Sequence, residues 1–486
     1  MELVYLWVEE YKNIKNQGFN FSPRFECEFK AEYDENNKLK DDCELIIKEN
    51  KDYVNIFPKN INVTAIVGEN GSGKSSLINS IITWINDEEY FFVFRCNKKL
   101  YYSNPSKIKL NFLPKDLEIE ENKDVEEAKS NLFNTYYEFK TILYNDNLFI
   151  DNIYNGCSEI TYRSFIFELI KDKTFKDSEE FKDNLNLEMT KKILELLKRD
   201  VKAIPLEYKS LYLEIRFHNT IEGRDIYTEL RKYKNDDCYT IPFEDFNLFE
   251  KISNELYSFD ILFKYKKNYK NVESMPSQGE ISLLFLLSSI YSSLIPILED
   301  EQNDHKEYFK NDVMIILDEP MNSLHPQWQK NFIYNLINFL KENFPDIEFQ
   351  IVLTTHSPFI LSDLPKENVI FLKKDENGNC KNVSDKIDIN QTFGANIHTL
   401  LSHGFFMEDG LMGEFAKEKI TEIFNYLKDD IQLQTIEEKN VKNIIELIGE
   451  DFLREKLLHM YNIKFPKSNE EKIKELEKEI ERLKNA

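Results

Sequence analysis

The residues best suited to chemistry lie in the run Gly68-Glu69-Asn70-Gly71-Ser72-Gly73-Lys74-Ser75, which follows the pattern G-x-x-x-x-G-K-[ST]. Glycines at these positions let backbone N–H groups turn inward around phosphate oxygens, and the N-terminus of a following helix adds a favourable dipole. Lys74 is expected to reach the β- and γ-phosphates of a nucleotide, and the Ser75 hydroxyl to hold Mg²⁺. An accidental glycine-rich turn is the alternative, and the elements expected on both sides of the run disfavour it.

Two adjacent carboxylates, Asp318 and Glu319, form the second candidate site, in the run I-I-L-D-E-P. The apolar residues before them predict a buried strand, and α/β sheets bind ligands at the carboxyl ends of such strands. Asp318 is expected to orient Mg²⁺, commonly through a coordinated water, and Glu319 to polarise the water that attacks the γ-phosphate. The pair is a weak signal alone and becomes a strong one beside the glycine-rich run.

Ser277 and Gly279 stand at the start of an apolar run that predicts a helix. Free N–H groups and a hydroxyl at a helix start bind phosphate, although an ordinary helix cap has the same composition. Their place upstream of the carboxylate pair favours the phosphate interpretation. His356, in the run T-T-H-S-P, follows a predicted strand, where an imidazole can hydrogen-bond the γ-phosphate and sense its presence. A capping or core histidine is the alternative.

Strands and helices are expected to position these residues. Residues 61–67 predict a buried strand that ends at Gly68, and 74–85 predict a helix. A second block predicts a strand from Val313 (V-M-I-I-L), a helix over 326–343 and a strand over 348–353. Strands that alternate with helices indicate an α/β unit on a mainly parallel sheet.

The remaining segments give weaker signals. Residues 90–102 suggest a hairpin, 189–199 a helix, and 473–483 a terminal helix that lies on its own domain rather than in a coiled coil. The apolar run 281–298 contains five serines and a proline, and a helix behind Ser277 and Gly279 explains it better than a membrane span.

Composition limits the classes of protein. The 486 residues are 41% hydrophobic, which excludes a wholly disordered chain, and the net charge of −24 disfavours a surface coated by nucleic acid or an anionic membrane. Six scattered cysteines indicate neither a zinc site nor a disulfide framework, so a reducing cytoplasm fits best. Charged residues near the N-terminus argue against a signal peptide.

The order of G-E-N-G-S-G-K-S-S, P-S-Q-G-E, I-I-L-D-E-P-M-N-S-L-H-P and T-T-H-S-P-F resembles the ABC-type ATPase heads of the RecF, SMC and OLD group. Within that group the chain is most similar to stand-alone OLD-like ATPases of bacterial anti-phage systems, of the Septu PtuA and retron-associated kind. The opening YLWVEEYKNIKNQGFNFS and residues 392–420 support the likeness. It implies an α/β fold: an ABC-type P-loop ATPase head with a mixed sheet and flanking helices, a mixed α+β insertion and a helical C-terminal segment.

The resemblance implies ATP and Mg²⁺ as ligands. In such heads the signature of one subunit completes the nucleotide site of another, so a homodimer or a higher even-numbered assembly is expected. Met275 and Pro276 depart from the leading residues of the transporter signature, and no glutamine loop is assigned. The implied sites are a phosphate loop of Gly68, Asn70, Gly71, Gly73, Lys74, Ser75 and Ser76, a signature of Ser277 and Gly279, a metal pair of Ser75 and Asp318, a following loop at 322–325, and catalytic Lys74, Glu319 and His356.

Four segments are expected along the chain. Residues 1–86 carry the first part of the head with the phosphate loop, and 87–272 form an accessory insertion. Residues 273–375 carry the signature, the carboxylate pair and the histidine, and 376–486 form a helical accessory region.

The preferred hypothesis is a cytoplasmic defence ATPase that controls a separate effector, such as an HNH nuclease, and has no membrane partner. Direct nucleic-acid binding stays open, with Lys264 and the lysines and tyrosines that follow it to Lys270 as the local candidate, although a solvated edge explains that run better. A DNA repair or recombination ATPase of RecF or SMC type is the first alternative. A nuclease within the C-terminal segment is the second, although no Asp-x-Asp or HNH constellation is found and His398 and His403 are interpreted as structural.

Overall fold

The chain divides into two compact units, Met1–Phe406 and Met407–Ala486, each described by itself. A computed structural model describes residues 2–35, 39–40, 43–84, 91–96, 99–103, 109–112, 119–121, 139–145, 158–161, 193, 196, 201–204, 211–217, 225–235, 238–242, 245, 248, 259–266, 273–274, 278–299, 312–321, 324–405 and 411–466.

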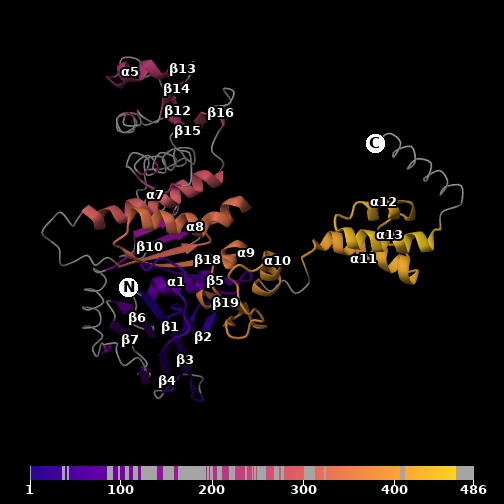
Figure 1. The fold of residues 1–486 in the computed structure, drawn as a ribbon, viewed down its shortest axis with the longest axis horizontal. Helices are drawn as coiled ribbons and strands as arrows, with labels where there is room; N and C mark the ends of the chain where they lie inside the picture. The colour runs from indigo at the N-terminus through magenta and orange to yellow at the C-terminus, as the bar shows by residue number, and fades with distance from the viewer. Residues whose placement is uncertain are drawn as a thin grey trace. The chain divides into compact units, whose positions relative to one another are not determined.

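A sheet of twelve strands dominates the described part of the first unit (Figure 1). Six neighbouring strands at one end pair in parallel, and most of the remaining strands pair antiparallel. In spatial order the strands are β11 (Ser158–Thr161), β10 (Phe139–Asn145), β17 (Asp312–Asp318), β18 (Glu348–Thr355), β5 (Ile61–Gly68), β19 (Val369–Lys374), β20 (Cys380–Asn382), β2 (Ile14–Asn20), β1 (Glu2–Tyr11), β6 (Phe91–Cys96), β7 (Lys99–Ser103) and β9 (Ile119–Glu121).

Helices cover both faces of the parallel half, so its central strands β17, β18 and β5 are almost entirely buried. Along β17 the side chains alternate between two cores, because successive residues of a strand point to opposite faces. Ile315 belongs to the core beneath α7 (Gln278–Glu299) and α8 (Pro326–Asn343), whereas Ile316 belongs to the core beneath α1 (Lys74–Trp84). Figure 1 shows α7 and α8 on one side of β10 and β18.

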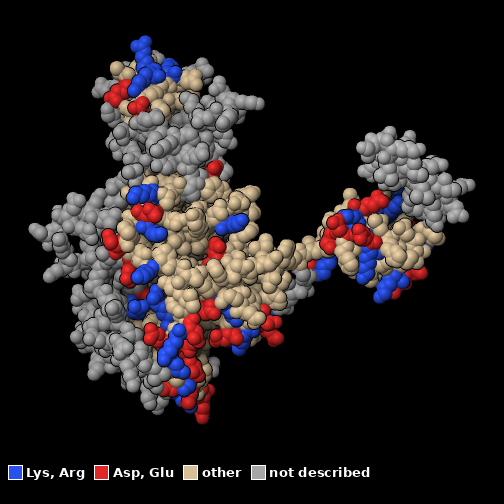
Figure 2. Space-filling view, viewed as in Figure 1, with Lys and Arg blue, Asp and Glu red and all other residues tan. Residues whose placement is uncertain are grey.

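The antiparallel half packs against a sheet of three strands, β3 (Phe25–Lys30), β4 (Glu44–Glu49) and β8 (Lys109–Phe112). Trp7 and Phe29 lie at the centre of this interface, with ring centroids 4.3 Å apart. On the face seen in Figure 2, acidic and basic side chains lie side by side over these strands, and Lys30 Nζ pairs with Glu44 Oε2 at 3.0 Å.

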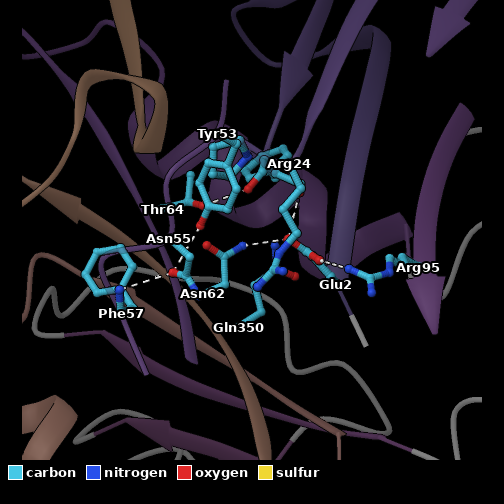
Figure 3. Close-up of polar contacts among 12 residues, drawn as sticks. Glu2, Arg24, Tyr53, Asn55, Phe57, Asn62, Thr64, Arg95 and Gln350 are labelled. Carbon is cyan, nitrogen blue, oxygen red and sulfur yellow. Dashed lines mark hydrogen bonds and ion pairs between the residues drawn. The ribbon is translucent and has the colours of Figure 1, made fainter. Parts of the chain in front are cut away.

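A buried carboxylate ties the antiparallel half to the parallel half (Figure 3). Glu2 Oε1 accepts hydrogen bonds from Ser22 Oγ at 2.6 Å and from Asn62 Nδ2 at 2.9 Å, and the carboxylate pairs with Arg24 and Arg95, both at 3.4 Å. These contacts join β1, β5 and β6, so a charge inside the fold has partners on several elements, as burial requires.

Smaller elements complete the first unit. Another sheet of five described strands has the order β13 (Lys234–Asn235), β14 (Cys238–Pro242), β12 (Leu211–Phe217), β15 (Phe259–Lys266) and β16 (Glu273–Ser274). Along the chain, α5 (Asp225–Leu230) lies between β12 and β13. After β18 come α9 (Pro358–Ser362), α10 (Ile397–Thr399) and a short π-helix, Leu400–Gly404.

The second unit is helical and has its own core. Helices α11 (Glu414–Asp429), α12 (Val441–Glu446) and α13 (Asp451–Lys464) enclose Ile423, Val441, Ile445 and Leu457. Among the described helices of the whole chain, none combines the length and the apolar composition that crossing a membrane needs.

The elements expected around the motifs are confirmed. The strand expected over 61–67 is β5, the helix expected from 74 is α1 and is described to Trp84, the strand expected from Val313 is β17, the helix over 326–343 is α8, and the strand over 348–353 lies within β18. The hairpin expected over 90–102 is confirmed as the antiparallel pair β6 and β7. Of the helix expected over 189–199 only Ile193 and Leu196 are described, both helical, and the terminal helix at 473–483 lies outside the described residues. Residues 87–272 supply β6, β7, β9, β10 and β11 to the large sheet, while the expected boundaries after 86, 272 and 375 stay predictions.

Candidate nucleotide-binding site

The glycine-rich run forms a tight loop between β5 and α1. Gly71 and Gly73 have φ angles of +76° and +109°, which L side chains rarely adopt. A Cβ atom on Gly68 would lie 2.3 Å from the carbonyl oxygen of Leu372, and one on Gly73 would lie 2.9 Å from Cys380 Cβ. The loop therefore needs glycine at 68 and 73 to pack on β19 and β20, and its backbone is available to line a phosphate cradle.

Lys74 extends back over this loop. Its ammonium donates to the carbonyl oxygens of Gly68 and Glu69, at 3.2 and 3.3 Å, and lies 3.8 Å from Glu319 Oε1. Burial lowers the pKa of Lys74, while the carboxylates of Glu319, Asp318 and Glu69 oppose that shift. A cation held among acceptors that a phosphate oxygen can replace suits anion binding.

Asp318 and Glu319 lie at the carboxyl end of β17, beside the loop. Burial raises the pKa of Asp318, and hydrogen bonds with Thr354 and Ser75 lower it in part. Thr354 Oγ1 on β18 donates to Asp318 Oδ1 at 2.5 Å. Because Ser75 contacts Asp318, a hydroxyl and a carboxylate oxygen, both ligands that Mg²⁺ prefers, are already adjacent.

Glu319 is the point where the candidate residues converge. Its Oε1 lies 3.1 Å from His356 Nε2 and 3.8 Å from Lys74 Nζ. The side chain of Glu319 is 15% exposed and that of His356 36% exposed, so a phosphate and a water can reach this edge of the sheet. The parallel pairing of β17, β18 and β5 brings the three residues together from distant parts of the chain.

The other residues expected at the site take varied positions. Asn70 and Gly71 form the exposed tip of the loop, and Ser76 is half-buried in the first turn of α1. Gly279 is buried in the first turn of α7, whereas Ser277 lies outside the described residues, so the signature is described only in part. Within 322–325 only the last two residues are described, and His325 caps α8 by accepting a hydrogen bond from Gln327 N at 3.2 Å.

Two residues at the site were not anticipated. Asn13, in the turn between β1 and β2, donates from Nδ2 to the carbonyl oxygen of Gly71 at 3.1 Å. Thr354 lies in the T-T-H-S-P run that located His356, but its hydroxyl was given no role. Each contact joins residues far apart in the chain, so only the match of their neighbours to a motif could have drawn attention to them.

The residues present fit a nucleotide and a magnesium ion. Ser72 Oγ in the loop and Asn13 Oδ1 beside it are buried without a hydrogen-bond partner among the described residues. Together with the Lys74 ammonium and the backbone of the loop, they form a polar surface around the place where phosphate oxygens would lie. Ser75 and Asp318 would supply oxygen ligands for the metal.

Comparison with known proteins agrees with this geometry. Residues 63–362, more than half of the chain, match the family described as "AAA domain, putative AbiEii toxin, Type IV TA system". The endonuclease GajA of Bacillus cereus (strain HuB5-5) is 25% identical over 389 residues, which cover 64% of this chain and 54% of that protein. The Retron Vc95 probable ATPase of Vibrio cholerae serotype O1 biovar El Tor is 34% identical over 96 residues, 19% of this chain and 16% of that protein. The Retron Ec83 probable ATPase of Escherichia coli is 26% identical over 192 residues, 39% of this chain and 30% of that protein.

The chain spans about half or less of the length of these relatives. The family match begins inside β5, before the phosphate loop, and continues past His356, so it includes every candidate residue described above except Asn13. The chain therefore belongs to the family described as "AAA domain, putative AbiEii toxin, Type IV TA system".

Proposed function

We propose that the protein binds and hydrolyses ATP. The observation that carries the proposal is the convergence of Lys74, Glu319 and His356, with Oε1 of Glu319 3.8 Å from the ammonium and 3.1 Å from the imidazole. At the carboxyl edge of a parallel sheet, a cation can balance phosphate charge, a carboxylate can orient the attacking water, and an imidazole can hydrogen-bond the terminal phosphate.

Each residue has a defined task in this proposal. The loop backbone and Lys74 bind the phosphates, and Lys74 balances their charge. Ser75 and Asp318 hold Mg²⁺, which when bound adds positive charge at the phosphate oxygens. Glu319 orients the attacking water and accepts its proton, while His356 holds the Glu319 carboxylate and contacts the terminal phosphate.

The mechanism is tested with Lys74→Ala and Glu319→Gln. We expect Lys74→Ala to bind ATP at least about 100-fold more weakly, because an ammonium in contact with phosphate is lost. Glu319→Gln should bind ATP but lower kcat by about 100-fold or more, because the glutamine amide cannot accept the proton. Isothermal titration and phosphate release measure the two effects. Normal turnover by Glu319→Gln would show that Glu319 is not the base.

We also propose that two copies close around ATP, with Ser277 and Gly279 of one copy facing the phosphate loop of the other. The support is the place of Gly279 in the first turn of α7, together with the likeness to ABC-type heads. Glu319→Gln should then show an ATP-dependent doubling of mass by light scattering. A variant that binds ATP and stays a single chain would contradict this assembly.

The biological role that we propose is control of a separate effector in anti-phage defence. Two relatives are named as probable ATPases of retrons, which supports an ATPase that works beside other components. ATP binding would hold the closed state and hydrolysis would release it, so the effector would sense the closed and open states. An HNH nuclease is the effector class that we favour.

A nuclease activity of the chain itself is the second candidate, because GajA is named an endonuclease. Among the described residues no three His, Cys, Asp or Glu side chains come together as a metal-binding group. On the face seen in Figure 2 the described Lys and Arg side chains are interleaved with Asp and Glu.

The purified chain, incubated alone with duplex or single-stranded DNA and Mg²⁺, should leave the DNA intact. Agarose gels with and without ATP provide the measurement, and Lys74→Ala serves as the control for ATP-dependent effects. Reproducible cleavage that Lys74→Ala or Glu319→Gln alters would make the chain its own effector. The separate-effector proposal would then be withdrawn.

A further inference from the structure

The hydroxyl of Thr354 contacts both residues of the carboxylate pair. Oγ1 donates its hydrogen to Asp318 Oδ1 at 2.5 Å and accepts the backbone N–H of Glu319 at 2.8 Å. A threonine hydroxyl has one hydrogen to donate and lone pairs to accept, so the two bonds are compatible. The parallel register of β17 and β18 sets Thr354 directly opposite Asp318.

The second of these bonds holds an unusual backbone. Glu319 has a φ angle of +49°, in the left-handed region that residues other than glycine rarely adopt. Such a conformation persists only where neighbouring groups hold it, and the N–H of Glu319 is held by Thr354. The turn at Glu319 sends the chain out of β17 and places its carboxylate beside Lys74 and His356.

The position of Thr354 excludes direct contact with solvent. Its side chain is fully buried, and it belongs to a strand whose neighbours on both sides are also buried. A threonine in such a place is expected to satisfy its hydroxyl, but a single acceptor would suffice. Instead the hydroxyl bridges two consecutive residues whose side chains have different tasks.

We propose that Thr354 is the positioning residue of the site: its hydroxyl sets where Asp318 lies for the metal and where Glu319 lies for the attacking water. The inference rests on the proposed ATPase function and adds a residue to it. Without the hydroxyl, Asp318 gains rotational freedom and Glu319 loses the bond that holds its left-handed turn. Both groups would remain present but would be displaced from the geometry that catalysis needs.

Thr64 provides a matched control. It is also a buried threonine in the same sheet, one strand away on β5, and its Oγ1 donates to the carbonyl oxygen of Phe21 at 2.7 Å. That hydrogen bond holds the backbone of Phe21, which is not one of the candidate site residues. Thr64→Val therefore removes an equally buried hydroxyl without touching the site.

The experiment compares Thr354→Val, Thr354→Ser and Thr64→Val in the full chain. Valine keeps the shape of threonine without the hydroxyl, and serine keeps the hydroxyl. We expect Thr354→Val to lower kcat about tenfold or more, to raise the Mg²⁺ concentration for half-maximal turnover about fivefold, and to change KM for ATP less than about threefold. Thr354→Ser should retain at least about one third of the turnover, and Thr64→Val at least about half.

The outcomes separate positioning from structural damage. Equal losses in Thr354→Val and Thr64→Val, or an unchanged Mg²⁺ requirement in Thr354→Val, would overturn the inference, as would normal turnover by the valine variant. If melting curves show that Thr354→Val does not fold, Thr354→Cys is tested in its place, because a thiol is only a weak hydrogen-bond donor.

The inference and the proposed function fail in different ways. If the wild-type chain binds a fluorescent ATP analogue but does not hydrolyse ATP, the proposal that the protein is an ATPase is overturned. The Mg²⁺ dependence of analogue binding then tests Thr354: an increased requirement in Thr354→Val supports positioning of Asp318, and an unchanged one overturns it. A wild-type chain that binds no nucleotide would overturn both.

Discussion

Gly71 and Gly73 share a left-handed backbone but differ in their surroundings. Nothing lies within 4 Å of a Cβ atom added to Gly71, whereas one added to Gly73 would overlap Cys380, at 2.9 Å from Cβ and 3.0 Å from Sγ. Substitution at Gly71 therefore adds backbone strain alone, and substitution at Gly73 adds the same strain together with a steric clash.

Gly73→Ala should accordingly lower the free energy of unfolding more than Gly71→Ala does. We expect Gly71→Ala to lower the free energy of unfolding by about 1 kcal/mol, and Gly73→Ala by about 2–4 kcal/mol with a loss of ATP binding, because the loop must move away from β20. Denaturant unfolding and isothermal titration measure the two quantities.

A second substitution isolates the clash. Cys380→Gly removes the two nearest contacting atoms and is itself expected to cost stability, because Cys380 is fully buried. In the Cys380→Gly background, the cost of Gly73→Ala should therefore be smaller than in the wild-type chain, and the cost of Gly71→Ala should be unchanged. Equal losses in the two alanine variants would show that contact with Cys380 does not constrain the loop.

Motif spacing identified candidate residues that the structure brings together, but not the residues that hold them in place. Lys74, Asp318, Glu319 and His356 each follow a recognisable strand, so their convergence follows from the alternation of strands and helices. Asn13 contacts Gly71 across 58 positions and Thr354 contacts Asp318 across 36, and neither pair has a local pattern. A long-range hydrogen bond leaves no periodicity in the sequence, so the contacts of Asn13 and Thr354 could be identified only from the structure.

At the scale of elements, three of the six parallel strands, β5, β17 and β18, were predicted, because helices cover both of their faces and leave them largely apolar. β5 is buried along its whole length and reads as one apolar run between polar turns. The first strand of the chain is also buried for seven successive residues, but Glu9 and Glu10 interrupt its end, and the next element along the chain is a strand rather than a helix. Without strand–helix alternation, nothing in its sequence distinguishes a strand from the start of a helix.

The partner of that first strand shows why the hairpin of β1 and β2 was not predicted. Gly18 on β2 lies opposite Trp7, and a Cβ atom there would meet Tyr5 Oη at 1.8 Å. The sequence reads as a glycine within a polar stretch, whereas the structure uses the glycine to admit two aromatic side chains from the neighbouring strand.

Polar contacts then fix the hairpin of β1 and β2 on the parallel half. Gln350 on β18 accepts the Leu3 N–H at 2.6 Å and donates to the Leu3 carbonyl oxygen at 3.0 Å, next to the Glu2 cluster of Figure 3. The same hairpin carries Asn13 to the phosphate loop at its other end. The element that closes the buried core is thus also an element of the nucleotide site.

At the scale of the whole molecule, the C-terminal unit has a core of its own around Ile423 and Leu457. One carboxylate organises its surface: Glu422 on α11 accepts the backbone N–H groups of Gln434, Thr435 and Ile436, at 2.6, 2.7 and 3.3 Å, and the Thr435 hydroxyl. Burial raises the pKa of Glu422, but these hydrogen bonds outweigh burial and lower it to about 2.

The lowered pKa makes the stability of this unit depend on pH. A carboxyl whose folded pKa lies below its unfolded value, about 4.3, stabilises the fold fully above that value and loses the contribution as pH falls towards 2. Glu422→Gln should therefore lower the stability of residues 407–486 by about 1–2 kcal/mol at pH 6, after allowance for solvent screening, and by progressively less below pH ~4.

Hydrogen–deuterium exchange in the full chain measures this difference, because exchange reports on α11 and α13 separately from the first unit. The matched control is Glu446→Gln, which removes an exposed carboxylate of the same unit, 3.8 Å from the Lys442 ammonium, and should change protection little at any pH. A loss of exchange protection in Glu422→Gln that is the same at pH 6 and pH 3 would mean that the side chain acts through packing rather than through its charge. A loss of exchange protection that is confined to the C-terminal unit and becomes smaller as pH falls would mean that this unit responds to acid independently of the candidate nucleotide site.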